Sequence, residues 1–348
     1  MEINEKYMWR AIELAASGRG FASPNPMVGA VIAAPDGRII GEGWHRRCGE
    51  AHAEVNAVAS VSESDRKLIP ESTIYVTLEP CAHYGKTPPC AVMLANVGFK
   101  KVVVASVDQF SKVNGRGIAI LREAGAEVVT GVLDDVARRL NAKFFTAHTE
   151  HRPWITLKWA QSADGYLDHV RDMSASAARF STPMSSLAVQ RLRASHDAIA
   201  VGLGTYLADR PKLSLRLWPG SKPKPMVLCF RGISSDTEKT VDNIAVNNRT
   251  ATPQLIDAAV EKIPALLDML YRQGVTSLLV EGGAFTLKTF IDSGFWDMAR
   301  IETAAAPLGE KGAVPAPHIG AEACHIDFFG PNMVQYFANN PLADVKNL

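Results

Sequence analysis

The sequence lacks a predominant charge, and it also lacks a long apolar run. Its 37 lysines and arginines almost balance its 36 aspartates and glutamates, for a net charge of +1. A balance of this kind creates no field that would attract nucleic acid or anionic lipid. No stretch approaches the roughly 18 apolar residues that a transmembrane helix needs. We therefore expect neither nucleic acid nor a membrane as a partner.

Cysteine is scarce, and its number is odd. The five residues are Cys48, Cys81, Cys90, Cys229 and Cys324. Disulfide frameworks are typical of short secreted chains, so in 348 residues this set indicates reduced thiols or metal ligands. The first residues show no basic segment followed by an apolar stretch, so we expect no secretory signal. We predict a cytoplasmic protein.

Length and patterning predict two α/β domains. A chain of 348 residues exceeds one ordinary domain, and 47% apolar with 21% charged residues is an ordinary globular balance. In the first part, short apolar strands alternate with helical patterns, which indicates an α/β sandwich with a largely buried sheet. The polar stretch 148–153 breaks the alternation, and a second α/β series follows. We place the domains at residues 1–147 and 153–348.

The expected elements follow from periodicity and from turn residues. Strands of the first domain are expected at 28–33, 38–41, 73–78, 101–105 and 127–130. Its helices are expected between the cap Asn4 and Gly18, at 52–61, from Pro89 onward, at 117–124 and at 134–146. In the second domain we expect strands at 154–159, 198–201, 226–230 and 276–280, helices at 183–194, 263–273 and 284–293, and a surface loop at 219–225.

The clearest chemical pattern combines His52 and Glu54 with Cys81 and Cys90. One imidazole and two thiolates form a soft ligand set that suits tetrahedral zinc. Three protein ligands leave the fourth position for water, which zinc makes much more acidic. Glu54 stands two residues from His52 at a helix start, where its carboxylate can carry a proton between that water and a leaving amine. Zinc nucleobase deaminases use this arrangement, although with two residues rather than eight between the cysteines.

A closed structural zinc site is the alternative interpretation. Cys48, His45 or His83 would then supply the fourth ligand, and Cys48 lies only four residues before His52. A closed site would hold no water and would perform no hydrolysis.

The second half carries weaker signals. The run 276–286 combines an apolar strand, the glycine pair Gly282-Gly283 and a helix start, where backbone N–H groups can approach a phosphate. A tight strand-to-helix turn explains the two glycines equally well. The run 201–205 is a second possible point of approach. No Gly-x-Gly-x-x-Gly opens an early βαβ unit, which disfavours a Rossmann domain.

Three motifs of the first half closely resemble the RibD family of riboflavin biosynthesis. They are the run SPNPMVG at 23–29, His52-Ala53-Glu54, and EPCAHYGKTPPC at 79–90, whose long cysteine spacing is normal in that family. The resemblance continues in the second half at 154–160, 162–165, 190–193, 205–209, 213–216 and 280–283. It implies a cytidine-deaminase-like α/β/α sandwich followed by a dihydrofolate-reductase-like α/β domain.

For the deaminase, the resemblance implies zinc at His52, Cys81 and Cys90, Glu54 as proton shuttle, and substrate contacts from Asn25, His45, His83 and Lys86. These residue types fit, because a lysine can meet a phosphate while Asn and His read ring edges. From the sequence alone, Asn25 can equally be a turn residue between two prolines, and Lys86 a solvated loop charge. The family's usual run after the fifth strand is replaced by 108–111 here, and we assign no contact to it.

For the reductase, the resemblance implies substrate contacts from Lys158, Arg193, Leu213, Arg216 and Glu281, and NADPH contacts from Ser162, Phe180, Thr205, Asp209, Gly282, Gly283, Ala284 and Phe285. Arg193 and Arg216 would hold the phosphate, while Lys158, Asp209 and Glu281 would surround the ribose. The chain departs from the family at 178–182 and at Arg210, which weakens this half of the comparison. Without the family, Arg193 can be a solvated helix residue and Glu281 a strand-end charge.

The resemblance implies two steps on one small molecule. The first is hydrolytic deamination of 2,5-diamino-6-(5-phosphoribosylamino)pyrimidin-4-one, with zinc. The second is NADPH-dependent reduction of the ribosyl chain, which gives 5-amino-6-(5-phosphoribitylamino)uracil. We also expect a homo-oligomer, a dimer or tetramer. The alternatives are a deaminase with an inactive reductase half that serves as scaffold, a non-catalytic zinc module, and a deaminase of polynucleotides, which the neutral net charge disfavours.

Overall fold

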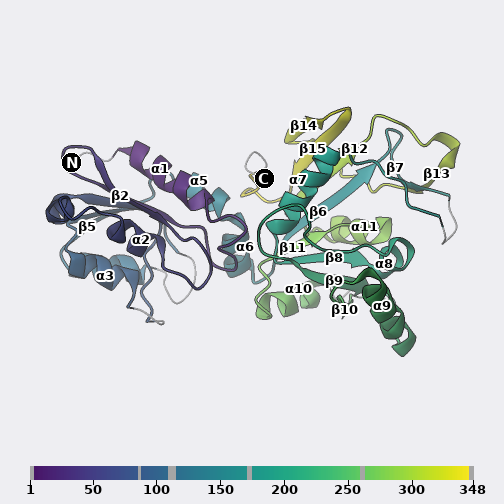
Figure 1. The fold of residues 1–348 in the computed structure, drawn as a ribbon, viewed down its shortest axis with the longest axis horizontal. Coiled ribbons are helices and arrows are strands. Elements are labelled where there is room, and N and C mark those ends of the chain that lie inside the picture. The colour runs from purple at the N-terminus through teal and green to yellow at the C-terminus, as the bar shows by residue number, and fades with distance from the viewer. Residues whose placement is uncertain (1–3, 85–87, 109–114, 171–174, 259–262, 345–348) are drawn as a thin grey trace. The chain divides into compact units, whose positions relative to one another are not determined.

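The chain forms two compact units, Met1–Glu150 and His151–Leu348. A computed structural model describes residues 4–84, 88–108, 115–170, 175–258 and 263–344 (Figure 1). Within these residues, no helix is both long and apolar enough to cross a membrane. The polar stretch 148–153 was expected to separate the domains, but residues 148–150 still belong to a helix. The division between the two units falls directly after Glu150.

The first unit is built on a five-stranded sheet in the order β2-β1-β3-β4-β5. Its strands are β1 (Gly29–Ala33), β2 (Ile39–Trp44), β3 (Thr73–Leu78), β4 (Lys101–Ser106) and β5 (Glu127–Thr130). Its helices are α1 (Glu5–Ala16), α2 (Ala53–Ala59), α3 (Cys90–Val97), α4 (Arg116–Glu123), α5 (Asp134–Leu140) and α6 (Ala142–Glu150), with a 3₁₀ helix at Arg66–Glu71. Strand β1 is antiparallel to β2 and β3, whereas β3, β4 and β5 run parallel.

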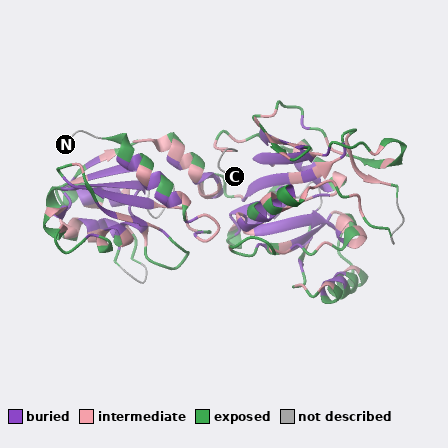
Figure 2. Ribbon diagram, turned by 45° about the horizontal axis from the view of Figure 1, so that its top comes forward, coloured by how far each residue is buried: buried purple, intermediate pink, exposed green. Residues whose placement is uncertain are grey.

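Helices cover both faces of this sheet, so its central strands β1 and β3 are buried along their whole length (Figure 2). Ile32, Ile74 and Val102 point to one face of the sheet and form a core with α2, α3 and α4. Val31 and Val103 face the opposite way, toward α1 and α5. Successive strand residues point to opposite faces, so apolar residues at every position make such a strand fit only between two layers. The predicted α/β/α sandwich is confirmed.

One predicted helix of this unit is wrong. The pattern at 134–146 indicated a single helix, but the chain leaves helical geometry at Asn141 and forms α5 and α6. The buried Asn141 amide accepts a hydrogen bond from the Met27 backbone N–H and donates one to the Met27 carbonyl, each at 2.8 Å. A side chain that satisfies a distant backbone in this way favours a local break, which helical periodicity does not reveal.

The second unit contains an eight-stranded sheet in the order β10-β9-β8-β11-β6-β12-β15-β14, with a separate β13-β7 pair. Its strands are β6 (Trp154–Gln161), β7 (Tyr166–His169), β8 (Ala198–Gly202), β9 (Lys224–Cys229), β10 (Gln254–Asp257), β11 (Ser277–Val280), β12 (Met298–Thr303), β13 (Gly312–Pro315), β14 (His325–Phe329) and β15 (Asn332–Ala338). Its helices are α7 (Pro183–Ala194), α8 (Leu203–Asp209), α9 (Ser235–Asn248), α10 (Ile263–Arg272) and α11 (Ala284–Ser293), with a 3₁₀ helix at Gly309–Lys311.

Six strands of the large sheet, from β10 to β12, run parallel, and β15 and β14 complete it antiparallel. Helices α10 and α11 pack with β6 residues such as Leu157 on one face. Helices α7, α8 and α9 pack with β8 and β9 on the other. The carboxyl ends of the parallel strands therefore meet at one edge, which is where ligands bind in such sheets.

Candidate functional site

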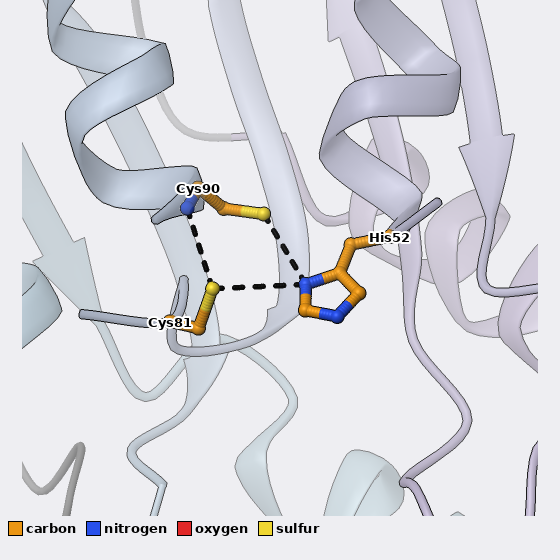
Figure 3. Close-up of side chains that lie close together, drawn as sticks. All are labelled: His52, Cys81 and Cys90. Atoms are coloured by element: carbon orange, nitrogen blue, oxygen red, sulfur yellow. Dashed lines mark hydrogen bonds between the residues drawn. The ribbon is translucent and has the colours of Figure 1, made fainter. Parts of the chain in front are cut away.

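In the first unit, one imidazole and two thiols converge on a common point (Figure 3). The His52 Nδ1 atom lies 3.3 Å from the Cys90 sulfur and 3.6 Å from the Cys81 sulfur. All three ligand atoms lie within 4.8 Å of one another. These separations are close to the edges of a tetrahedron around one zinc ion, whose bonds to nitrogen and sulfur are roughly 2.0–2.3 Å long. The donor set therefore fits zinc in both chemistry and geometry.

Local structure brings each of the three residues to that point. His52 is the N-cap residue of α2, and Cys90 is the first residue of α3, directly after Pro89. Cys81 follows the end of β3 and accepts a hydrogen bond of 3.3 Å from the Cys90 backbone N–H. Two helix N-termini thus face the cluster, and their positive dipole ends favour thiolate over thiol.

The pKa values of the two thiols are shifted in opposite directions. The interaction with Cys90, and then that with His52, lower the pKa of Cys81 to about 4, far below its ordinary value, although burial alone would raise it. The same interaction and the burial of Cys90 raise the pKa of that thiol. The lowered pKa of Cys81 favours the thiolate, which is the form of cysteine that binds metal.

Glu54 is 3% exposed in the first turn of α2, two residues after His52. Burial raises the pKa of this carboxyl to about 7, against the lowering effect of nearby His52. A buried acid beside a cation-binding cluster matches the arrangement of a carboxylate that handles protons rather than one that binds metal. Among the described residues, only His52, Cys81 and Cys90 form a group with metal-ligand geometry.

A second imidazole borders this cluster. The buried His45 ring meets the His52 ring edge-on, with centroids 5.5 Å apart. Its Nε2 lies 3.2 Å from the Asn25 amide nitrogen, and its Nδ1 lies 3.2 Å from the Ala51 carbonyl oxygen. Burial lowers the pKa of His45, which favours the neutral ring. The structure therefore brings together the predicted pair Asn25 and His45 beside the ligands.

Glu79 is a residue whose role the sequence reasoning missed. Its buried carboxylate accepts hydrogen bonds from the backbone N–H groups of Asp108, Gly115, Gly117 and Ile118, at 2.9–3.3 Å. A side chain at Gly117 would also place its Cβ 2.0 Å from the Pro80 carbonyl oxygen. Glu79 therefore ties the cysteine loop to the start of α4. Its place directly before Pro80-Cys81 was the only signal.

Other residues predicted for this site stand apart from it or cannot be placed. His83 and Cys48 are both exposed, and neither belongs to the metal-ligand group of the described residues. The fourth ligand of a closed site is thus not found among Cys48, His45 and His83. Lys86 lies outside the described residues.

In the second unit, a cavity of about 650 Å³ opens at the carboxyl ends of the central strands. Predicted residues that line it are Lys158, Phe180, Thr205, Asp209, Glu281, Gly282, Gly283 and Ala284. A second cavity of about 500 Å³ shares residues 178–181 with the first. Ligand pockets are typically of this size, and together the two offer room for an extended ligand or for two ligands.

The glycine pair forms a close contact within the cavity wall. Gly283 has a φ of 53°, and a Cβ there would lie 2.6 Å from the Thr205 hydroxyl oxygen. Gly283 is also the N-cap residue of α11 and provides no side chain to satisfy the first N–H groups of that helix. Backbone donors are therefore available beside the cavity for an anionic group, which fits the pyrophosphate of a dinucleotide.

A buried ion pair with Arg193 fixes the position of the Glu281 carboxylate. Arg193 of α7 donates to both Glu281 carboxylate oxygens, at 2.8 and 2.6 Å, and to the Ser214 carbonyl at 3.1 Å. Burial would raise the pKa of Glu281, but Arg193 and Lys158 hold it below its ordinary value. The Arg193 guanidinium is thus engaged with protein atoms rather than free to bind a phosphate.

Five predicted residues do not line the larger cavity: Ser162, Arg193, Leu213, Arg216 and Phe285. The Ser162 hydroxyl bonds Asp164 and the Tyr166 N–H, and so it holds a turn. Leu213 is packed in a core, while Arg216 and Phe285 are exposed. Motif resemblance does not distinguish a residue that contacts a ligand from one that builds the wall behind it.

Comparison with known families matches both units. Residues 1–106 match the cytidine and deoxycytidylate deaminase zinc-binding region. Residues 153–328 match the RibD C-terminal domain.

Relatives cover nearly the whole chain. The riboflavin biosynthesis protein RibD of Aquifex aeolicus is 35% identical over 325 residues, with 89% of each chain covered. RibD of Bacillus amyloliquefaciens is 38% identical over 320 residues, with 85% of this chain and 82% of that protein covered. A diaminohydroxyphosphoribosylaminopyrimidine deaminase/5-amino-6-(5-phosphoribosylamino)uracil reductase of Thermotoga maritima has a similar structure, with 30% identity, a TM-score of 0.81, and 96% and 98% coverage.

Proposed function

The chain belongs to the RibD family of riboflavin biosynthesis, and on that premise we propose which of its residues perform the family's two reactions. It is a bifunctional enzyme that uses zinc and NADPH. It deaminates 2,5-diamino-6-(5-phosphoribosylamino)pyrimidin-4-one and reduces the ribosyl chain to give 5-amino-6-(5-phosphoribitylamino)uracil. The deaminase domain is assigned to residues 1–147 and the reductase domain to 153–348.

For deamination, the convergence of His52, Cys81 and Cys90 is the observation that carries the assignment. These three residues would hold zinc, which makes water acidic enough to attack an aminopyrimidine at neutral pH. Glu54 takes a proton from the attacking water and delivers it to the leaving nitrogen, because its buried carboxyl stands beside the ligand set without joining it. Ammonia then leaves as a neutral molecule.

Substrate recognition is assigned to Asn25 and His45, whose side chains contact each other beside His52. An amide and a neutral imidazole can both donate and accept hydrogen bonds, so the pair can read the edge of a pyrimidine. Lys86 and His83 remain proposed contacts from the family motif, with Lys86 suited to the phosphate by its charge.

For reduction, the larger cavity of the second unit is the observation that carries the assignment. NADPH supplies the hydride, and the protein supplies binding and orientation. We assign the coenzyme to Thr205, Asp209, Phe180 and the turn 282–285, with Ser162 behind them. Lys158 and Glu281 contact the ribose chain from neighbouring strands. Arg216 and the backbone at Leu213 are assigned to the phosphate, while Arg193 supports Glu281.

A coupled assay tests both assignments. The purified protein is mixed with the diaminopyrimidine nucleotide and NADPH, and ammonia and coenzyme oxidation are measured with and without a zinc chelator. We expect both signals without chelator. With chelator, ammonia release stops, while coenzyme oxidation continues when the deaminated intermediate is supplied directly. Ammonia release without any coenzyme oxidation would favour the deaminase with an inactive second unit.

Two further properties are proposed from the family alone. A cytoplasmic location agrees with the metabolic role of the relatives. A homo-oligomer, a dimer or tetramer, is tested by light scattering on the purified protein, where a monomer mass would contradict it.

A further inference from the structure

Four polar residues form a row across neighbouring strands of the second sheet. Arg300 of β12 pairs in register with Lys158 of β6 on one side and with Tyr336 of β15 on the other. Glu281 follows β11 at the same level, since the last residue of β11 pairs with the residue before Lys158. Residues at one level of a sheet point to the same face. We call Glu281, Lys158, Arg300 and Tyr336 the polar row.

Helix α7 covers this face of the sheet with polar groups. Arg193 of α7 binds Glu281, and Ser185 of α7 donates to Glu302, which stands two residues after Arg300. Glu302 also accepts from Ser181 at 2.8 Å and from the Asn332 amide at 2.7 Å. Glu281 within the polar row and Glu302 beside it are therefore already bound by other donors.

Arg300 is the exception in this layer. Its side chain is 2% exposed, and neither Nη1 nor Nη2 has a hydrogen-bond partner among the described residues. The nearest acidic oxygen, on Glu302, is 3.8 Å away, and the guanidinium carbon lies 5.6 Å from the Phe329 ring centroid. A buried cation with one long ion pair and no hydrogen bond at its terminal nitrogens is poorly compensated for its loss of water, so its presence calls for a reason other than packing.

The neighbour on which this charge acts is Lys158. Lys158 lines the larger cavity, whereas Arg300 does not. Burial lowers the pKa of Lys158, Arg300 and Arg193 lower it further, and Glu281 and Glu302 oppose them. Two cations at one level of adjacent strands repel each other, and because Arg300 is buried, only the lysine can move toward solvent.

We propose that Arg300 is a positioning residue of the reductase, whose buried charge, without a hydrogen bond at Nη1 or Nη2 within the described part of the chain, directs the Lys158 amine away from β12 and into the cavity. This inference rests on the proposed contact of Lys158 with the ribose chain. Arg300 touches neither substrate nor coenzyme. Its charge also makes Lys158 release its proton more readily, so a larger fraction of the amine is neutral near neutral pH.

The charges that face Lys158 come from every neighbouring element. Its sheet neighbours contribute Glu281, Arg300 and Glu302, and α7 contributes Arg193. The cavity wall adds Asp168, Arg179 and Asp209. A test must therefore change Arg300 alone and leave these groups in place.

The experiment compares three variants of the full chain. Arg300→Met removes the charge and keeps an unbranched side chain, and Arg300→Lys keeps the charge. Arg272→Met is the matched control, because it removes an exposed arginine from α10, which covers the opposite face of the sheet. For each variant, the pH dependence of Lys158 labelling by an amine reagent is followed by mass spectrometry. Reductase kcat and KM are measured against pH, and thermal unfolding is recorded.

In Arg300→Met we expect the labelling midpoint of Lys158 to move to higher pH, with several-fold slower labelling at pH 8. The KM for the ribosyl substrate should rise several-fold, and the pH profile of the reductase should move in the same direction. Arg300→Lys should keep the Lys158 labelling midpoint and the reductase KM close to the wild-type values. Arg272→Met should change neither quantity. The melting temperature of Arg300→Met should decrease, because the buried carboxylates of Glu281 and Glu302 lose a cation that lowers their pKa values.

Unchanged titration of Lys158 in Arg300→Met would overturn the inference. It would also be overturned if Arg300→Met and a second variant, Arg300→Gln, both failed to fold, since Arg300 would then be structural. A shifted Lys158 titration with unchanged reductase kinetics would support the effect of Arg300 while it removed Lys158 from the ribose site.

Discussion

The ligand cluster of the first unit is built from residues close together in the sequence, whereas the cavity of the second unit is built from residues far apart in the sequence. His52, Cys81 and Cys90 come from one short stretch, and two of them stand at helix N-termini. The second site draws on strands that are neighbours in the sheet but more than a hundred residues apart in the sequence, namely β6 and β11. A site built within one stretch appears as a motif, whereas a site built across strands becomes visible only through the strand order.

The largest expected effect tests whether the first site is chemically independent of the second. Glu54→Gln keeps the size of the side chain but removes the proton carrier, so ammonia release should fall by about 10²–10⁴-fold. Coenzyme oxidation on the deaminated intermediate should stay at the wild-type rate. Metal analysis should still find zinc, because Glu54 is not a ligand. Loss of both activities in this variant would mean that the two sites are not separable.

The second prediction changes the site of the second unit and asks whether the first site keeps its activity. Glu281→Ala removes a proposed ribose contact and leaves Arg193 buried without its carboxylate. Loss of a charged hydrogen bond of about 1.5–3 kcal/mol predicts a decrease in reductase kcat/KM of about ten- to a hundredfold, with deamination unchanged. Unchanged reductase kinetics would remove Glu281 from the site.

Glu281 also predicts a pH dependence of stability. Its pKa is lower in the folded chain than the ordinary value of 4.5. The stabilisation by Arg193 is therefore fully present above pH 4.5 and is lost as the pH falls through the lower, folded-state value. Urea unfolding of Glu281→Gln should thus differ from the wild type near pH 6 and converge with it in acid. A constant difference at all pH values would contradict this account.

The smallest expected effect concerns a long-range support of the first site. Asn141→Ala removes both hydrogen bonds to the Met27 backbone, next to the turn that carries Asn25. We expect a loss of about 1–3 kcal/mol in the free energy of unfolding, because the half-buried Met27 N–H and carbonyl groups lose their partner. The KM of the deaminase should rise more than its kcat falls. Asn56→Ala, which removes amide hydrogen bonds to the Trp44 and Ala51 carbonyls in the same unit, is a control for general loosening.

The sequence predicted the fold class and most elements where patterns were local. β3, β5, α7 and α11 have the predicted bounds, because their ends coincide with a change in apolar periodicity or a cap residue. Several elements of the second unit were not predicted at all, among them α9 and the antiparallel strands β14 and β15. The β14 strand alternates half-buried with exposed residues, including Phe328 at 70% exposure, so its apolar residues mark no buried face.

For the sites too, local patterns could be predicted from the sequence and contacts between distant segments could not. The metal-ligand triad could be predicted because chemistry fixes its residue types, whereas Arg300 sits in an ordinary strand sequence. Arg193 shows the intermediate case. Its position was predicted from the family, but its hydrogen bonds to Glu281 could not be, since they depend on how α7 lies over the end of β11.

The carboxylate of Glu79 has a practical consequence for protein engineering. One side chain receives four amide hydrogens, from Asp108 after β4 and from residues 115–118 at the start of α4, and Gly117 leaves no room for a larger residue. Mutagenesis that varies Glu79, Gly117 and their hydrogen-bonding neighbours one at a time would mostly yield unfolded variants. A library aimed at new pyrimidine substrates should keep residues 79–81 and 115–118 as a single fixed block and introduce its diversity around Asn25 instead.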